Sequence, residues 1–324
     1  MMKVGILGCG VIARKMANTL RMMRANGEDV CLYAAAARDL QRAQAFCETE
    51  GFSKAYGSYE ALAQDENVDL VYIATPHSHH FDHMKLCLSH GRAVLCEKAF
   101  TLNAAQAREV LELAREKNLL LCEAMWTRFL PVWQVVREVM PRLGNVQFVS
   151  ADVHFPAEGV ERISNPALAG GALLDIGVYS LTVASMVLGD DFERMDTSVQ
   201  LLSTGVDRQE SISLYYPDGA MAQLTAGVAA CGANRALIGG DRGSLHVENI
   251  FNPQKLTLYA DGSVTDIPVP PQLTGYEYEV RACMKALQEG RIECSEMPHA
   301  ETIRIMEIMD ELRRRWGVVY PQEA

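Results

Sequence analysis

A turn with two glycines near the N-terminus places the strongest constraint on the fold. Residues 4–7 are an apolar run typical of a buried strand, and a helical pattern continues as far as residue 23. The turn between them has the spacing GxGxxA, and it contributes the candidate ligand-binding residues Gly8, Cys9, Gly10, Val11 and Ile12. Glycines let a ligand approach the backbone closely, and the helix N-terminus presents N–H groups to a pyrophosphate. The pattern therefore predicts the first strand and helix of a dinucleotide-binding sheet.

The end of the second apolar run bears on the choice between NAD and NADP. This run, Val30 to Ala36, is followed by Ala37, Arg38 and Asp39. An NAD-binding domain usually carries a carboxylate here to hold the ribose 2′-hydroxyl. Ala37 followed by the Arg38 guanidinium fits a 2′-phosphate instead, so the sequence favours NADP(H). Asp39 is a competing candidate for the ribose contact, which leaves NAD(H) as the alternative.

A third apolar strand, residues 69–73, leads into a segment with four histidines between residues 77 and 83. No cysteine or glutamate stands beside them at ligand spacing, and neighbouring residues on a helix point about 100° apart. We therefore interpret the segment as a polar loop over a cofactor and predict no metal site. Its candidate cofactor-binding residues are Thr75, Pro76, His77 and His80.

The next apolar run, Val94 to Cys96, stops at the adjacent opposite charges of Glu97 and Lys98. Ligands of open α/β sheets bind at the carboxyl ends of strands, so both residues are candidates for the binding site. Alone, the pair could equally be an ion pair at a strand end. The alternation of strands and helices up to this point predicts a doubly wound parallel sheet of the α/β class.

The second half of the chain has a different pattern. Residues 146–153 alternate apolar and polar side chains, which indicates a half-exposed strand, and further short runs separated by turns follow up to residue 259. We expect a dinucleotide-binding Rossmann domain at residues 1–122. Residues 123–324 are expected to form an α+β domain with an open, mostly antiparallel sheet. Two closing helices, near 276–287 and 300–315, can pack back on the first domain.

Asp175 and Tyr179 follow the glycine-rich turn at residues 169–171, in a segment with a helical pattern. Residues four apart share one face of a helix, so both side chains can reach one ligand. The alternative is a capped helix whose tyrosine covers its end. Arg162 precedes the turn and is a candidate substrate-binding residue.

Composition excludes several classes of partner. The formal net charge of −11 disfavours nucleic acid and anionic membranes. The nine cysteines include no CxxC pair, so we interpret them as reduced core residues of a cytoplasmic protein. We see no signal peptide and no run of about eighteen apolar residues that would span a membrane.

These motifs together resemble the glucose–fructose oxidoreductase/inositol dehydrogenase (Gfo/Idh/MocA) family. The resemblance rests on the GxGxxA turn, on residues 74–80 (ATPHSHH) and on residues 95–98 (LCEK). This chain has Ala99 where the family usually has a proline, often preceded by a cis peptide bond. Residues 123–129 (EAMWTRF) resemble the branch of dimeric dihydrodiol dehydrogenase and NADP-dependent xylose dehydrogenase. That resemblance would place Trp126 and Arg128 near the cofactor.

The resemblance implies an NADP(H)-dependent dehydrogenase of a sugar or a trans-dihydrodiol. Asp175 and Tyr179 match the family's catalytic pair, and Tyr179 would transfer the proton while Lys98 lowers its pKa and binds substrate. Asp175 would orient the substrate or Lys98. The open sheet would be the surface of a homodimer. Two alternatives remain: a reductase of a cyclic or nucleotide-linked keto sugar, and a regulator that binds the dinucleotide without catalysis. The retained Lys98, Asp175 and Tyr179 argue against the regulator, and Ala99 argues mildly for it.

Overall fold

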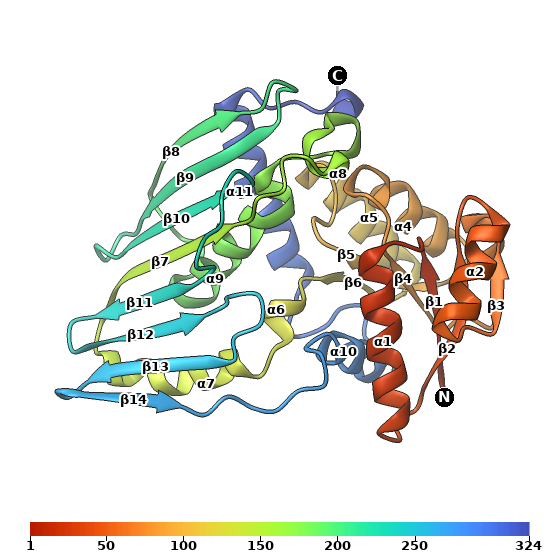
Figure 1. The fold of residues 1–324 in the computed structure, drawn as a ribbon, viewed down its shortest axis with the longest axis horizontal. Helices are drawn as coiled ribbons and strands as arrows, with labels where there is room; N and C mark the ends of the chain where they lie inside the picture. The colour runs from red at the N-terminus through yellow and green to blue at the C-terminus, as the bar shows by residue number, and fades with distance from the viewer. Residues whose placement is uncertain (324) are drawn as a thin grey trace. The chain divides into compact units, whose positions relative to one another are not determined.

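The computed structural model describes residues 1–323, which divide into two compact units (Figure 1). Unit 1 comprises Met1–Phe129 and Gln272–Met306. Unit 2 comprises Leu130–Pro271 and residues 307–323.

Unit 1 is built on a six-stranded parallel sheet with the strand order β3-β2-β1-β4-β5-β6. Its strands are β1 (Met2–Leu7), β2 (Val30–Ala36), β3 (Lys54–Tyr56), β4 (Leu70–Ile73), β5 (Ala93–Glu97) and β6 (Leu121–Ala124). Its helices are α1 (Val11–Ala25), α2 (Leu40–Glu50), α3 (Tyr59–Ala63), α4 (His80–Ser89), α5 (Ala104–Lys117), α6 (Trp126–Phe129) and α10 (Glu277–Gln288), with a 3₁₀ turn η1 (His77–His79) before α4. This order is that of a Rossmann sheet, so the predicted doubly wound fold is confirmed.

The local sequence explains where these elements begin and why they are buried. All residues of β4, β5 and β6 are buried, as expected for strands covered by helices on both faces. The side chains of Asp39, Ser58 and Asn103 accept hydrogen bonds from the first-turn N–H groups of α2, α3 and α5. Short β3 and α3 lie in a polar stretch that gave no clear periodic signal in the sequence.

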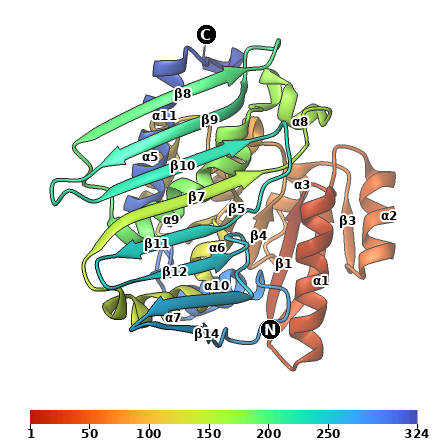
Figure 2. The ribbon, with the colours of Figure 1, turned by 60° about the vertical axis from the view of Figure 1, so that its left-hand side comes forward.

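Unit 2 contains an eight-stranded sheet with the order β14-β13-β12-β11-β7-β10-β9-β8 (Figure 2). Its strands are β7 (Val146–His154), β8 (Arg194–Leu201), β9 (Asp207–Tyr215), β10 (Met221–Gly227), β11 (Ala236–Gly240), β12 (Gly243–Glu248), β13 (Lys255–Ala260) and β14 (Ser263–Ile267). Only the pairing of β10 with β7 is parallel; the other pairs are antiparallel. The predicted open, mostly antiparallel sheet is therefore confirmed, with β14 as an added edge strand.

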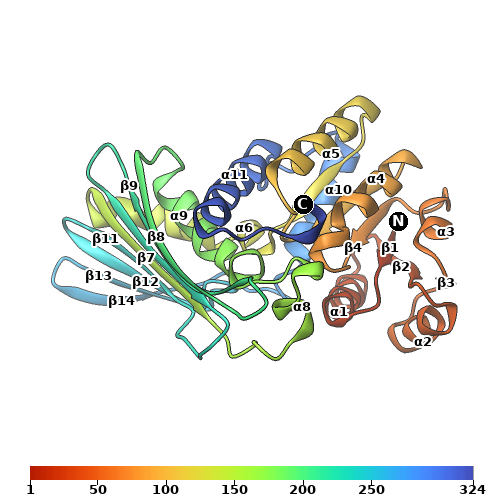
Figure 3. The same cartoon turned by 90° about the horizontal axis from the view of Figure 1, so that it is seen from above.

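Helices of unit 2 lie on one face of this sheet, as Figure 3 shows for α9 (Val178–Leu188), which packs on β7 and β10. Every second residue near the end of β7, at Val149, Ala151 and Val153, is buried, which matches the alternation in the sequence. The shorter helices are α7 (Val132–Val139) and α8 (Glu161–Ser164), and α11 (His299–Trp316) runs from unit 1 into unit 2. The 3₁₀ turns are η2 (Met140–Leu143), η3 (Pro166–Leu168) and η5 (Pro321–Glu323).

The segment that carries Asp175 differs from the expected α-helix. Residues Leu173–Gly177 form a turn of π-helix, which continues into α9. The buried Asp207 carboxylate accepts a hydrogen bond of 2.5 Å from the Leu173 N–H. A Cβ atom at Gly171, whose φ is +116°, would lie 2.2 Å from the same carboxylate, so only glycine fits there. Asp207 thus occupies the space that the glycine-rich turn leaves open and fixes the start of the π-helical turn.

One stretch of unit 2, Pro166–Leu188, is long and apolar enough to cross a membrane by length and composition alone. The sequence pattern had not singled it out, because no unbroken apolar run occurs there. Most of this stretch is buried inside the fold, as in the core helix of a globular domain. Among the described residues, no other helix meets these criteria.

The burial of Asp207 predicts a pH-dependent stability. Burial raises the pKa of Asp207 to about 6, while the buried Glu210 nearby has a pKa well above its usual range, also because of burial. Between about pH 4 and about pH 6, the folded protein therefore holds a proton on Asp207 that the unfolded chain has lost, and the free energy of unfolding falls as the pH rises through this window. In Asp207→Asn this fall should be smaller by up to about 3 kcal/mol.

The measurement is urea unfolding at several pH values across the window, for the wild type and Asp207→Asn. The exposed Asp191, changed to asparagine, is the matched control and should follow the wild-type curve. Parallel curves for the wild type and Asp207→Asn would contradict the prediction.

Candidate active site

The register of the parallel sheet brings the candidate residues of unit 1 to one edge. Leu7 pairs with Ala36 on one side and with Ile73 on the other, and Ile73 pairs with Cys96. The Gly8 N–H donates to the Ala36 carbonyl at 2.9 Å, and the Ala74 N–H donates to the Leu7 carbonyl at 2.8 Å. Four neighbouring strands therefore end at one edge, which carries the glycine turn, Arg38, Thr75, Glu97 as the last residue of β5, and Lys98 directly after it.

The two glycines of the turn have different structural roles. Gly8 has a φ of +96°, and a Cβ there would lie 2.8 Å from the Ala74 carbonyl oxygen, so it fits the close contact of β1 with β4. A Cβ at Gly10 would meet nothing within 4 Å. Gly10 is the N-cap of α1 and makes no side-chain cap, and the first turn of α1 carries no acidic residue. The first-turn N–H groups of α1, which include those of Val11 and Ile12, therefore receive no hydrogen bond from the side chain of the N-cap residue.

The end of β2 presents cationic side chains. Ala37 is buried and Arg38 is exposed, and the Asp39 carboxylate accepts the Arg42 N–H at 2.8 Å as the N-cap of α2. Burial raises the pKa of Tyr59, while the charges of Arg38 and Arg42 oppose that shift, so both guanidiniums act on the same neighbourhood. Arg42, one helical turn beyond Arg38, is a second cation at this end that the sequence pattern did not identify.

His80 links two of the loops at this edge. It is fully buried, and its ring nitrogens lie 2.8 Å from the Thr75 and Ala99 carbonyl oxygens. Burial lowers the pKa of His80 to about 4, so near pH 7 the ring is neutral, and its single N–H donates to one of the two carbonyls while the other nitrogen only lies beside the second. The imidazole thus ties the loop after β4 to the loop after β5, where the Lys98–Ala99 peptide bond is cis. In this structure His80 positions the backbone beside Lys98, and its burial leaves its ring no exposed surface.

Glu97 and Lys98 have separate environments although they are adjacent. Glu97 is buried and accepts a hydrogen bond from the Tyr72 hydroxyl, and burial raises the pKa of both groups. Lys98 is half-buried at the carboxyl end of β5. The carboxyl of Glu97 is therefore directed into the core of unit 1, and Lys98 is the member of the pair that is accessible at the sheet edge.

Trp126 and Arg128 lie in α6 and make contacts within unit 1. The Trp126 ring stacks on Tyr276 with a centroid distance of 4.3 Å. The Arg128 guanidinium donates to the Glu301 carboxylate at 2.5 Å and to the Glu296 carbonyl at 3.1 Å. These contacts fix the segment after β6 to the C-terminal part of the same unit.

The candidate residues of unit 2 gather around the π-helical turn. Asp175 and Tyr179 are both buried, and Asp175 forms an ion pair of 2.6 Å with Arg162, whose side chain is half exposed. The Tyr179 ring packs edge-on against Phe251 with a centroid distance of 4.5 Å. Arg162 therefore lies beside the carboxylate of the predicted pair, and Phe251 is a neighbour that no sequence motif indicated.

The edge of the unit 1 sheet fits a dinucleotide. Open space lies over Gly10 and the N-terminus of α1, which suits a pyrophosphate, and the cations at the end of β2 suit a further phosphate on the ribose. Lys98 lies at the carboxyl end of β5, on the same edge of the sheet. Unit 2 has a polar cluster of its own, which consists of Asp175, Tyr179 and Arg162.

Comparisons with known proteins agree with this assignment. Residues 2–124 match the family described as an oxidoreductase family with an NAD-binding Rossmann fold, and residues 134–246 match the GFO/IDH/MocA C-terminal domain. Trans-1,2-dihydrobenzene-1,2-diol dehydrogenase of Mus musculus is 34% identical over 98% of both chains. The enzyme of the same name from Danio rerio is 36% identical over 99% of this chain and 98% of its own.

Solved structures also resemble this chain over nearly its whole length. A 3-ketoreductase from Actinomadura kijaniata, in complex with NADP and TDP-benzene, has a TM-score of 0.86 and 26% identity, with 97% of each chain covered. An aldose-aldose oxidoreductase from Caulobacter crescentus has the same TM-score of 0.86 at 20% identity, over 98% of this chain and 97% of its own, and shows the shared fold. Two matched family domains and full-length relatives above 30% identity show that the chain belongs to the Gfo/Idh/MocA family of oxidoreductases.

Proposed function

We propose that this enzyme is an NADP(H)-dependent dehydrogenase of a trans-dihydrodiol or a similar polyhydroxylated substrate. The observation that carries the proposal is the end of β2, where Arg38 is exposed and the competing Asp39 carboxylate caps α2. An exposed guanidinium at this place favours a ribose 2′-phosphate over a 2′-hydroxyl. The relatives named as dihydrodiol dehydrogenases support the substrate class, at 34–36% identity over the whole chain.

Lys98, Asp175 and Tyr179 are the proposed catalytic residues, with Arg162 as a further substrate-binding residue. When bound, NADP⁺ would supply the acceptor for the hydride that leaves the carbinol carbon of the substrate. The hydroxyl proton of the substrate must leave at the same time, and a positioned side chain speeds that transfer. We assign the proton transfer to the Tyr179 hydroxyl and assign substrate hydrogen bonding to Lys98. Asp175, held by Arg162 at 2.6 Å, orients the substrate from the π-helical turn that precedes α9.

The cofactor-binding role extends to the loops that share the sheet edge. We assign contacts with the dinucleotide to the glycine turn, to Thr75, Pro76 and His77, and to the segment of Trp126 and Arg128. His80 and Glu97 support that site from the core of unit 1. His80 contacts the Ala99 carbonyl, and Glu97 accepts a hydrogen bond from Tyr72.

A second candidate activity is the reduction of a keto group on a nucleotide-linked sugar. It is supported by the similarity to the 3-ketoreductase whose structure contains NADP and TDP-benzene, at 26% identity. A panel of trans-dihydrodiols, aldoses and keto sugars, each with NADP⁺ or NADPH, separates the two activities. Dinucleotide binding without turnover of any of them would favour a regulator.

We further propose a cytoplasmic homodimer that associates through the sheet of unit 2. The nine cysteines form no disulfide in the structure and most of them are buried, as is usual for proteins of a reducing compartment. Light scattering of the purified chain tests the dimer, and a monomeric mass at micromolar concentration would contradict it.

Gly10→Ala should weaken dinucleotide binding without a loss of stability. The added methyl group meets no protein atom within 4 Å, so the fold accommodates it, but it enters the space in which we place the pyrophosphate. We expect the Kd for NADPH to rise while the thermal unfolding midpoint stays close to that of the wild type. Unchanged NADPH binding in Gly10→Ala would show that the cofactor does not use this space. Gly8→Ala is the contrasting variant and should unfold at a lower temperature, because its Cβ is too close to Ala74.

Arg38→Ala should weaken the binding of NADPH much more than that of NADH. A charge-assisted contact with the 2′-phosphate is worth about 1.5–3 kcal/mol, which corresponds to a rise in Kd of about tenfold to a hundredfold. Fluorescence titration with both nucleotides measures the difference. Arg24→Ala is the control, because Arg24 lies in the last turn of α1, away from the N-terminus at which we place the pyrophosphate. Tighter binding of NADH than of NADPH, unchanged by Arg38→Ala, would refute the NADP(H) preference.

Tyr179→Phe should lower kcat by about a hundredfold or more, as expected when a proton-transfer group is removed. The phenyl ring keeps the edge-on contact with Phe251, so the fold and NADPH binding should be preserved. Steady-state kinetics with the best substrate of the panel measure the loss, with Tyr259→Phe on the exposed side of β13 as the control. Full turnover in Tyr179→Phe would move the proton transfer to another residue.

A further inference from the structure

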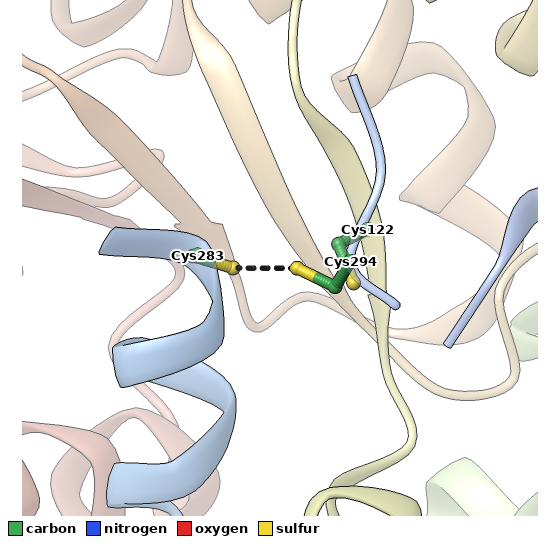
Figure 4. A group of neighbouring side chains, drawn as sticks. All are labelled: Cys122, Cys283 and Cys294. Atoms are coloured by element: carbon green, nitrogen blue, oxygen red, sulfur yellow. Dashed lines mark hydrogen bonds between the residues drawn. The ribbon is translucent and has the colours of Figure 1, made fainter. Parts of the chain in front are cut away.

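Three cysteines that are far apart in the sequence meet in the core of unit 1. Cys122 lies on β6, Cys283 on α10 and Cys294 in the loop that follows α10 (Figure 4). All three are fully buried or nearly so, and their sulfur atoms lie within 4.8 Å of one another. The Sγ atoms of Cys283 and Cys294 are 3.9 Å apart. No sequence pattern predicts this cluster, because none of the three cysteines belongs to a CxxC pair.

Backbone contacts hold the three sulfur atoms in place. The Leu121 N–H donates to the Ile292 carbonyl at 3.1 Å, which joins the loop of Cys294 to β6 next to Cys122. The Met297 N–H donates to the Cys294 carbonyl at 3.2 Å and closes that loop. The cluster is therefore built by a strand, a helix and a hydrogen-bonded loop, which gives it a defined geometry.

The helix that carries Cys283 also carries a buried carboxyl group without a hydrogen-bond partner among the described residues. Glu279 lies one helical turn before Cys283 on α10 and is fully buried, and within the described part of the chain neither of its carboxyl oxygens has a hydrogen-bond partner. Glu279 and Cys283 are four residues apart on α10, so their side chains leave the helix on the same face. A buried carboxyl without a partner is costly, and such groups usually find a hydrogen bond or a cation.

The spacing and chemistry of these donors suit a soft divalent cation. A tetrahedral zinc site with Zn–S bonds of about 2.3 Å places two sulfur atoms about 3.8 Å apart. The observed 3.9 Å between Cys283 and Cys294 agrees with that value. Thiolates select metals such as zinc over magnesium or calcium, and structural zinc sites have four protein ligands. We propose that Cys122, Cys283 and Cys294, with Glu279 as the fourth ligand, form a structural site for a zinc-class cation.

The three thiols do not titrate alike. Hydrogen bonds with Cys122 and Cys283 lower the pKa of Cys294 to about 5, whereas the pKa values of Cys122 and Cys283 lie well above their usual range, so ionisation of those two thiols would require the bound cation. A thiolate is the form that binds metal, and a bound cation would add positive charge to a part of the core that contains several buried carboxyls. Glu97 and Glu123 are the other buried carboxyls of unit 1 whose pKa is raised by burial. The proposed site does not depend on the oxidoreductase reaction or on its substrate.

Cd²⁺ is a suitable probe, because its bonds with thiolates absorb in the ultraviolet, whereas its bonds with carboxylates do not. The reduced full-length protein, freed of metal, is titrated with Cd²⁺ without oxygen, and circular dichroism follows the fold. We expect one Cd²⁺ per chain with a charge-transfer band, and displacement by Zn²⁺. Cys294→Ser should remove most of the band. Glu279→Gln should keep the band but weaken Cd²⁺ binding by at least about tenfold.

Cys87→Ser is the matched control, because Cys87 is buried in α4 but has no place in the cluster, and it should bind Cd²⁺ like the wild type. If Cys294→Ser does not fold, Cys283→Ser provides the same comparison. A folded wild-type protein that binds no Cd²⁺ with a charge-transfer band would overturn the proposal. A band that persists in a folded Cys294→Ser or Cys283→Ser protein would do the same. Isolation of the protein with a Cys283–Cys294 disulfide, seen as the loss of two hydrogens by mass spectrometry under reducing growth conditions, would also contradict it.

Discussion

The in-register pairing of β2, β1, β4 and β5 is the constraint on which the candidate cofactor site depends. These neighbouring strands are parallel, and each ends at or within one residue of a position that is paired with the end of its neighbour. The loops after them therefore start from one edge of the sheet. Each loop then contributes a different chemical group: an open helix N-terminus, a guanidinium, a threonine-proline turn and an ammonium. His80 joins two of these loops through carbonyls at 2.8 Å, so the edge is held by side-chain as well as backbone contacts.

Much of this edge could be predicted from sequence, because glycine turns and apolar runs are local signals. The GxGxxA turn, the Arg38 position and the Glu97-Lys98 stop are all readable within short windows. The π-helical turn of Asp175 could not be predicted, because it depends on the Asp207 carboxylate, more than thirty residues away. The same holds for Arg42, which has no motif of its own, and for the contact of Tyr179 with Phe251. The division at residues 122 and 123 and the roles of the catalytic residues remain predictions.

The cysteines illustrate the limit of local patterns most directly. Each of Cys122, Cys283 and Cys294 stands alone in the sequence, and each is explained by burial in an apolar segment. Their meeting follows from the path of the chain: α10 and the loop after it return to unit 1 and pair with β6. No spacing rule covers a cluster whose members come from distant parts of a chain, so the metal chemistry of such a core becomes visible only in three dimensions.

The buried acids of unit 1 bear on the charge state beside Lys98. Burial raises the pKa of Glu97, while the hydrogen bond from Tyr72 and the charge of Lys98 act in the opposite direction. Glu123 and Glu279 share the same core and also favour the protonated form, and groups that interact this closely titrate together. A cation bound by Glu279 and the cysteines would favour ionisation of Glu97, because a positive charge nearby stabilises a carboxylate. The electrostatic setting of Lys98 is therefore determined partly by residues behind the sheet, and an account of its reactivity must include the core of unit 1.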